Sequence, residues 1–136
     1  MNVWVLLVIL VIIFLTGGVV VSNLERLDAA QIAQYARNAG FTGQDLITAV
    51  AVALAESGGN AKAVGDSGTS FGLWQIHWTV HRETYGVAPE ELFDPQANAN
   101  AAMKVFQEQG WNAWSTYSVN NRYTDFLGAA TQAVNA

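Results

Sequence analysis

A long apolar run near the amino end constrains this chain more than any other feature. Residues 3–21, VWVLLVILVIIFLTGGVVV, include no charged side chain. A helix of that length would measure roughly 28 Å, close to the hydrocarbon core of a bilayer at about 30 Å. A cleaved signal peptide is the alternative, but it expects a Lys or Arg before the run and a small-x-small site after it, and the sequence shows neither clearly. We therefore expect residues 1–21 to form a transmembrane helix, with residues 3–21 in the lipid.

The remainder of the chain has the composition of a water-soluble domain. Its first side-chain charge is Glu25, and 53 of the 115 residues from Ser22 onward are apolar, an ordinary share for a soluble fold. Six Lys and Arg stand against 11 Asp and Glu without any basic cluster, which argues against a nucleic-acid partner. The absence of Cys excludes a disulfide scaffold, a cysteine nucleophile and a thiolate metal site. We expect residues 22–27 to be a short linker and residues 28–136 to form one domain.

Capping residues predict the first two helices of this domain. Asp28 can cap a helix that ends at Gly40 as a left-handed stop. A second helix is predicted to begin at Thr42, with Asp45 in the capping-box position, and to run through LITAVAVALAES. Because that helix is apolar almost all round, we expect it to be the buried centre of the domain.

The rest of the domain is predicted to be helical except for one glycine-rich excursion. Residues 57–72 are rich in glycine, which indicates a loop or an irregular hairpin. A short helical piece is expected around residues 73–83. The Asp-Pro pair at residues 94–95 is a strong start for a helix that ends at Gly110, and Thr-Asp at residues 124–125 can begin a final helix. The expected fold class is mainly α, in an α+β arrangement with a short hairpin or loop.

Glu56 is the most unusual polar residue of the domain. It is the only charged residue between Asp45 and Lys62, where an apolar helix runs into the glycine-rich stretch. Its carboxyl should be partly removed from water at the wall of a cleft, and such desolvation raises the pKa of a carboxyl group. A raised pKa is what a general acid needs at neutral pH. A solvated helix terminus is the alternative explanation of the same position.

Four sequence blocks resemble, in order, the lysozyme-like superfamily, specifically lytic transglycosylases and goose-type lysozymes. The blocks are AESGGN at residues 55–60, SFGLWQI at 70–76, FDP with NA at 93–95 and 98–99, and GWNAWSTY at 110–117. In that family a Glu-Ser pair ends a buried helix, and a Gly-Leu-x-Gln segment follows a glycine-rich stretch. The resemblance covers residues 28–127 and implies a lysozyme-like fold. The later blocks look like those of phage-borne members.

The resemblance also implies roles for individual side chains. Glu56 would protonate the glycosidic oxygen between N-acetylmuramic acid and N-acetylglucosamine in peptidoglycan. Ser57 would hold the acid or a substrate amide, and Gln75 would line the cleft and bind a sugar. Tyr117 would reach toward the acid and orient it. No cofactor is implied.

Asp66, in the loop GDSG at residues 65–68, separates two possible reactions. Glycosidases usually work with two carboxylates, so hydrolysis is plausible if Asp66 faces Glu56 across the cleft. Otherwise Glu56, acting first as acid and then as base, gives the 1,6-anhydro product of a lytic transglycosylase. An Asp in a Gly-Ser loop is more often a turn former than a catalyst, so the sequence favours the transglycosylase.

The tryptophans and histidines support weaker expectations. We expect Trp74 and Trp111 to lie mainly in the core. Either Trp78 or Trp114 should reach the groove. His77 and His81 have the spacing of two metal ligands on one helical face. No Glu joins them in the arrangement of metalloproteases, so no metal site is expected.

Together these inferences predict a membrane-anchored enzyme that degrades peptidoglycan. We expect a single-pass protein in the internal membrane of a phage virion, or in a bacterial inner membrane with the domain facing the periplasm. Its partners would be peptidoglycan glycan strands, the membrane lipid and, in a virion, other virion proteins. A hydrolytic lysozyme of the same fold and a non-catalytic structural or wall-binding protein are the alternatives. A membrane-lesion protein acting through the leader would leave the four blocks unexplained.

Overall fold

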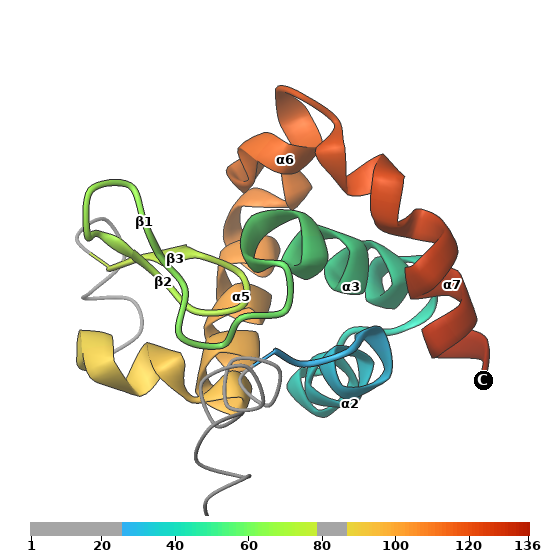
Figure 1. Ribbon diagram of the computed structural model, residues 1–136, viewed down its shortest axis with the longest axis horizontal. Helices are drawn as coiled ribbons and strands as arrows, with labels where there is room; N and C mark the ends of the chain where they lie inside the picture. Colours follow the sequence, from blue (N-terminus) through green and yellow to red (C-terminus); the bar gives the residue numbers. More distant parts are fainter. Residues whose placement is uncertain (1–25, 79–86) are drawn as a thin grey trace, which may run out of the picture.

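The computed structural model describes residues 26–78 and 87–136 (Figure 1). They form a mainly helical domain with one small antiparallel sheet, so the fold class expected from the sequence is confirmed. The predicted membrane helix and most of the predicted linker, residues 1–25, lie outside the described residues. Within the two described ranges, no helix combines the length and the apolar character needed to cross a bilayer.

The first helix begins and ends where its capping residues predicted. Helix α2 (Ala29–Ala39) follows Asp28, whose carboxylate accepts a hydrogen bond from the Gln31 amide at 2.8 Å. The Gln31 side chain in turn accepts one from the Asp28 amide at 3.0 Å. Gly40 ends the helix with a φ of 109°, in the left-handed region that glycine enters without steric cost.

Helix α3 (Gly43–Ser57) is the buried centre of the domain, as its apolar sequence predicted. Figure 1 shows it between α2 on one side and the segment around α6 on the other. The capping box expected at its start is wrong, because the Thr42 side chain makes no capping hydrogen bond. The Asp45 carboxylate instead accepts a hydrogen bond from the Trp111 indole at 3.1 Å. Asp45 thereby ties the start of α3 to a segment far along the chain.

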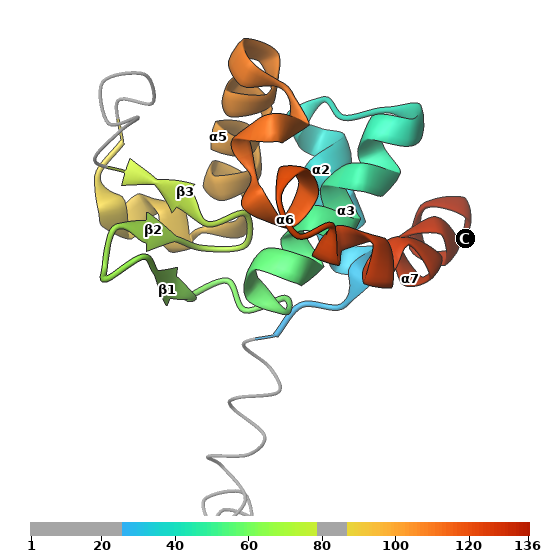
Figure 2. The same ribbon diagram turned by 90° about the horizontal axis from the view of Figure 1, so that it is seen from above.

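The glycine-rich stretch supplies the first two strands of a small sheet, which confirms the predicted hairpin. The strands of the sheet, in spatial order, are β1 (Val64–Gly65), β2 (Ser70–Phe71) and β3 (Ile76–His77), and both pairings are antiparallel. Figure 2 shows the three strands lying side by side at one end of the domain. The sheet therefore forms a separate wall beside the end of α3.

The helix expected around residues 73–83 is wrong in the part that the structure describes. After β2 the chain turns sharply through Gly72 and Gln75, whose φ angles are 79° and 48°, and continues as β3. Residues 79–83 lie outside the described residues. The positive φ angles exclude a helix here and bring β3 back beside β2.

A buried amide holds this turn in place. Asn98 is fully buried, and its Oδ1 accepts a hydrogen bond from the Trp74 amide at 2.8 Å. Its Nδ2 donates to the carbonyl oxygens of Phe71 at 2.8 Å and Leu92 at 2.9 Å. Because buried polar groups without partners are costly, the bonds to Phe71 and Trp74 fix the sheet and its turn against the helix that carries Asn98.

The carboxy-terminal part is a series of helices and 3-10 turns. They are η1 (Pro89–Phe93), α5 (Pro95–Gln109), η2 (Trp111–Ala113), α6 (Ser115–Ser118), η3 (Arg122–Phe126) and α7 (Leu127–Asn135). The Asp-Pro start of α5 is confirmed, since the Asp94 carboxylate accepts a hydrogen bond from the Ala97 amide at 2.9 Å. The predicted start of the final helix lies instead within η3.

Candidate active site

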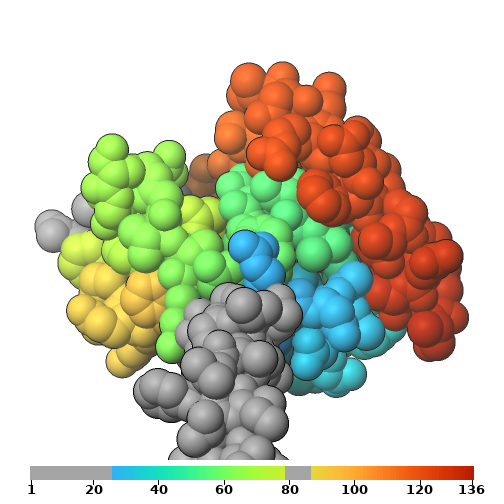
Figure 3. Space-filling model, viewed as in Figure 1, coloured from blue at the N-terminus to red at the C-terminus, as the bar shows by residue number. Residues whose placement is uncertain are grey.

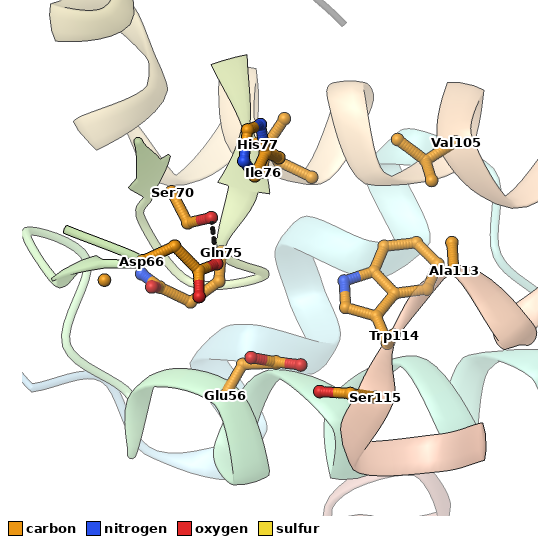
Figure 4. A pocket seen from close by; sticks show the side chains of 11 residues that line it. Glu56, Asp66, Ser70, Gln75, Ile76, His77, Val105, Ala113, Trp114 and Ser115 are labelled. Atoms are coloured by element: carbon orange, nitrogen blue, oxygen red, sulfur yellow. Dashed lines mark hydrogen bonds between the residues drawn. The ribbon is translucent and has the colours of Figure 1, made fainter. Parts of the chain in front are cut away.

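A pocket of about 290 Å³ lies between the sheet and the segment around α6 (Figure 4). In Figure 3 these two parts stand apart above α3, with a hollow between them. The pocket is lined from the sheet, from the end of α3, from α5 and from the start of α6 by Glu56, Gly65, Asp66, Ser70, Gln75, Ile76, His77, Val105, Ala113, Trp114 and Ser115. It brings together three of the five side chains that the sequence singled out: Glu56, Gln75 and Asp66.

Glu56 lies in the last turn of α3 and reaches the pocket wall. Burial takes its carboxylate out of water and raises the pKa of the group, and the negative charge of Asp66 raises this pKa further. A hydrogen bond from the Thr116 hydroxyl and the positive charge of Arg122 act in the opposite direction. The net effect is a raised pKa, which favours the protonated form of Glu56.

Asp66 lies on the sheet side of the same pocket. It occupies a tight turn with a φ of 49°, followed by Ser67 at 56°, so it is a turn former as the sequence indicated. Figure 4 shows its carboxylate on the other side of the pocket from that of Glu56. The Ser70 hydroxyl donates a hydrogen bond to Asp66 Oδ2 at 2.5 Å, and Ser70 itself is buried. The structure thus gives Asp66 a position at the pocket as well as a part in the turn.

Gln75 also lines the pocket, where its amide braces the hairpin. Its Nε2 donates hydrogen bonds to the carbonyl oxygens of Ala63 at 3.1 Å and Gly72 at 3.0 Å. A Cβ at Gly65 would overlap the Gln75 side-chain oxygen. Both hydrogen bonds of Nε2 therefore go to the backbone of the hairpin. Because Gly65 has no side chain, there is room beside it for the Gln75 amide.

Ser57 and Tyr117 lie elsewhere. The Ser57 hydroxyl donates to the Ala53 carbonyl at 2.9 Å and accepts from the Gly59 amide at 3.2 Å, contacts that finish α3. Tyr117 stacks on Tyr123 with ring centroids 4.6 Å apart. Among the described residues, neither Ser57 nor Tyr117 lines the pocket.

The hydroxyl that reaches Glu56 belongs to Thr116, which sequence reasoning missed. Thr116 Oγ1 donates to Glu56 Oε1 at 2.9 Å, and Thr116 is buried. Ser70, the partner of Asp66, was missed as well. Both side chains belong to segments that the sequence did single out, but no local pattern distinguishes these hydroxyls from their neighbours.

The tryptophans divide between core and pocket. Trp74 is fully buried, and its indole donates to the Ala49 carbonyl of α3 at 2.9 Å. The Trp114 indole donates to the Trp74 carbonyl at 2.8 Å, and Trp114 also lines the pocket. Trp111 packs against the core aromatic Phe41. Trp114, of the two predicted candidates, is the one placed at the pocket.

His77 lies on β3 and lines the pocket, so it is not on the helical face that its spacing from His81 suggested. His81 lies outside the described residues. Within residues 26–78 and 87–136, no cluster of three or more His, Asp or Glu side chains is placed to hold a metal ion.

A partly desolvated carboxyl facing a second carboxylate across a pocket can deliver a proton to a bound ligand. A family model described as a lysozyme-like domain matches residues 33–116, a range that includes Glu56, the sheet and Thr116. No match is found among curated proteins, and none among solved structures. Because the matched range covers more than half of the sequence, the chain belongs to the lysozyme-like domain family.

Proposed function

We propose that this protein cleaves the β-1,4 bond between N-acetylmuramic acid and N-acetylglucosamine in peptidoglycan, with Glu56 as the general acid. Membership of the lysozyme-like family indicates an enzyme that acts on peptidoglycan. The observation that carries the proposal is the position of Glu56 on the pocket wall, partly desolvated and with its pKa raised. A carboxyl group in this state still holds its proton where an exposed one has lost it.

The first step needs only Glu56. Its proton passes to the glycosidic oxygen as the bond from that oxygen to the anomeric carbon of N-acetylmuramic acid breaks, which leaves positive charge on the sugar and a carboxylate on Glu56. The Thr116 hydroxyl, 2.9 Å from Oε1, stabilises that carboxylate by a charge-assisted hydrogen bond. General acid catalysis of this kind contributes about 10²- to 10⁴-fold to a rate.

The second step separates hydrolysis from transglycosylation. In an inverting hydrolase a second carboxylate activates a water molecule on the opposite face of the sugar. Asp66 lies across the pocket from Glu56 (Figure 4) and is held by Ser70, and this arrangement favours hydrolysis. The sequence favoured a lytic transglycosylase, in which Glu56 takes the proton of the 6-hydroxyl and that oxygen closes on the anomeric carbon. The transglycosylase is our second candidate. Its reaction needs only one carboxyl group, and the raised pKa of Glu56 suits that group to act as the acid.

Product analysis distinguishes the two reactions. The full chain, purified in mild detergent, is incubated with cell walls, and the released fragments are analysed by mass spectrometry. Reducing ends indicate hydrolysis, and 1,6-anhydro ends indicate transglycosylation. Asp66→Asn should lower the rate by about 10²-fold or more if Asp66 is the base, and should leave most of the activity if the enzyme is a transglycosylase.

Glu56→Gln tests the proposal as a whole. We expect at least a 10²-fold loss of fragment release with an unchanged fold, because an amide cannot supply the proton. Glu108→Gln, at an exposed position of α5, is the matched control and should retain full activity. Equal activity of the wild type and Glu56→Gln would favour the alternative, a non-catalytic structural or wall-binding protein of this fold.

We further propose that residues 3–21 anchor the enzyme in a membrane with the domain on the side of the cell wall. The charge-free run supports the anchor, and the substrate supports the orientation. The phage origin rests on the likeness of GWNAWSTY to phage-borne members, and the alternative location is a bacterial inner membrane. In a host that expresses the chain, protease added to spheroplasts should digest the domain. Complete protection of the domain would contradict this orientation.

A further inference from the structure

The two oxygen atoms of Glu56 have different surroundings. Oε1 accepts a hydrogen bond from Thr116 Oγ1 at 2.9 Å, and Thr116 is only 6% exposed. Glu56 lines the pocket, whereas Thr116 does not. Oε1 therefore has a buried partner, and Oε2, which accepts no hydrogen bond from the residues that the structure describes, is the oxygen left for the pocket.

The hydroxyl of Thr116 is firmly placed relative to α3, the helix that carries Glu56. Trp114, two residues earlier, is 4% exposed and donates to the Trp74 carbonyl at 2.8 Å. Trp74 in turn donates to the Ala49 carbonyl of α3 at 2.9 Å. On the other side of Thr116, Tyr117 stacks on Tyr123. The two indole hydrogen bonds thus link the start of α6 to α3, and the ring stack links α6 to η3.

We propose that Thr116 is a positioning residue that keeps the reactive proton of Glu56 on Oε2, the oxygen facing the pocket. This inference rests on the proposed function. A neutral carboxyl carries its proton on one oxygen only, and while the Thr116 hydroxyl donates to Oε1 that proton lies on Oε2. The resemblance to known enzymes suggested Tyr117 for this orienting role, but the contacts assign it to the preceding residue.

The same hydrogen bond favours the state that follows proton transfer. Once Glu56 is a carboxylate, the Thr116 hydroxyl donates to a charged acceptor, and such bonds are stronger than those between neutral groups. Desolvation alone would hold the proton too tightly for easy release. Thr116 opposes this effect, which agrees with the direction in which it moves the pKa of Glu56.

Thr116→Val removes the donor while keeping the shape of the side chain, and Thr116→Ser keeps the hydroxyl. In the full chain in detergent, Thr116→Val should move the alkaline limb of the kcat profile to higher pH by about one unit. It should lower kcat by roughly tenfold, with KM nearly unchanged, because the bond acts on the acid rather than on the substrate. Thr116→Ser should restore both values.

A direct titration of the Glu56 side-chain carboxyl carbon by NMR gives a readout that does not depend on turnover. Thr116→Ala, which removes the same donor with a smaller side chain, is titrated beside Thr116→Val, so the comparison does not depend on one variant folding. Thr131→Val is the matched control, because its hydroxyl bonds the Leu127 carbonyl within α7 and Thr131 does not line the pocket. It should change neither the pH profile nor the titration.

An unchanged titration midpoint for Glu56 in Thr116→Val and Thr116→Ala would overturn the inference. This holds even if kcat fell equally at every pH, because a fall that does not depend on pH is expected of a purely structural residue. Failure of the proposed function looks different. In that case Glu56→Gln would remain as active as the wild type, whatever the variants at position 116 did.

Discussion

At the scale of single residues, the burial that suits Glu56 to act as an acid also lowers the stability of the fold at neutral pH. Its pKa in the folded chain is raised above the ordinary value of 4.5, so the folded state binds this proton more tightly than the unfolded state. The resulting contribution to the free energy of unfolding is present below about pH 4.5 and is lost as the pH rises through the native pKa. At neutral pH the buried carboxylate therefore costs stability, as strained or desolvated functional groups commonly do.

Replacing this carboxyl group should make the fold more stable at neutral pH. Glu56→Gln keeps an oxygen that can accept from Thr116 and removes the buried charge, so its Tm should exceed that of the wild type at pH 7. The gain should shrink at pH 4, where the wild-type carboxyl is protonated. Glu108→Gln, at an exposed position, should show no such pH dependence. Calorimetry at the two pH values measures the difference, and a gain of equal size at both would contradict the account.

The sequence predicted Glu56 but not its partner for a physical reason. A single charged residue in an otherwise apolar interval stands out in the sequence. Because burying a charge is costly, its presence there indicates a function. Thr116 and Tyr117 are adjacent in α6, a helix of four residues, and nothing local determines which of the two faces α3. That choice depends on contacts from Trp114 to the turn after β2, so only the folded chain reveals it.

At the scale of elements, the turn between β2 and β3 depends on Gly72. Its φ of 79° suits glycine, and a Cβ there would overlap the Asn98 amide and the Leu92 carbonyl. Gly72→Ala should therefore both strain the backbone and displace the buried amide, and lower the free energy of unfolding by about 3–5 kcal/mol. Urea denaturation of the full chain measures this loss.

Gly68 provides the matched comparison for that prediction. It lies in the β1–β2 turn with a φ of 91°, but a Cβ there would meet nothing within 4 Å. Gly68→Ala should thus cost only the backbone strain, about 1 kcal/mol. Similar losses for the two variants would show that the Asn98 contacts contribute little.

The elements predicted correctly are those specified by neighbouring residues. Helix α2 is an example, because its cap Asp28 and its stop Gly40 lie at its own ends. The turn at residues 72–75 was misread because the feature that holds it, Asn98, lies 24 residues beyond Trp74. Apolar residues at such a turn have the same short-range spacing as one face of a helix. Long-range hydrogen bonds decide whether such a segment forms a turn or a helix, and the local sequence pattern does not reveal them.

At the scale of the whole molecule, α3 joins the site to the point where the chain enters the domain. The Leu27 amide donates to the Gly59 carbonyl at 2.8 Å, and the Arg26 guanidinium donates to the Gly58 carbonyl at 3.3 Å. Both acceptors lie directly after α3, two and three residues beyond Glu56. Four residues, 22–25, lie between the proposed anchor and Arg26, and four residues span at most about 14 Å when fully extended. A membrane anchor at residues 3–21 would thereby keep the acid close to the lipid surface.

Phase separation in a detergent that clouds on warming tests the anchor on the entire chain. If residues 3–21 span a bilayer, the full chain should partition into the detergent phase, and a chain starting at Ser22 should remain in the aqueous phase. Placing Asp at both Ile9 and Ile12 should move the full chain into the aqueous phase, because each charge at the centre of a membrane helix costs about 2.5–3.5 kcal/mol. The full chain, the shortened chain and the double Asp variant should cleave soluble peptidoglycan fragments at similar rates. The anchor determines where the enzyme is located, whereas the pocket carries out the reaction. Recovery of the wild-type chain in the aqueous phase would contradict the anchor, and loss of cleavage without residues 1–21 would show that the domain depends on that segment.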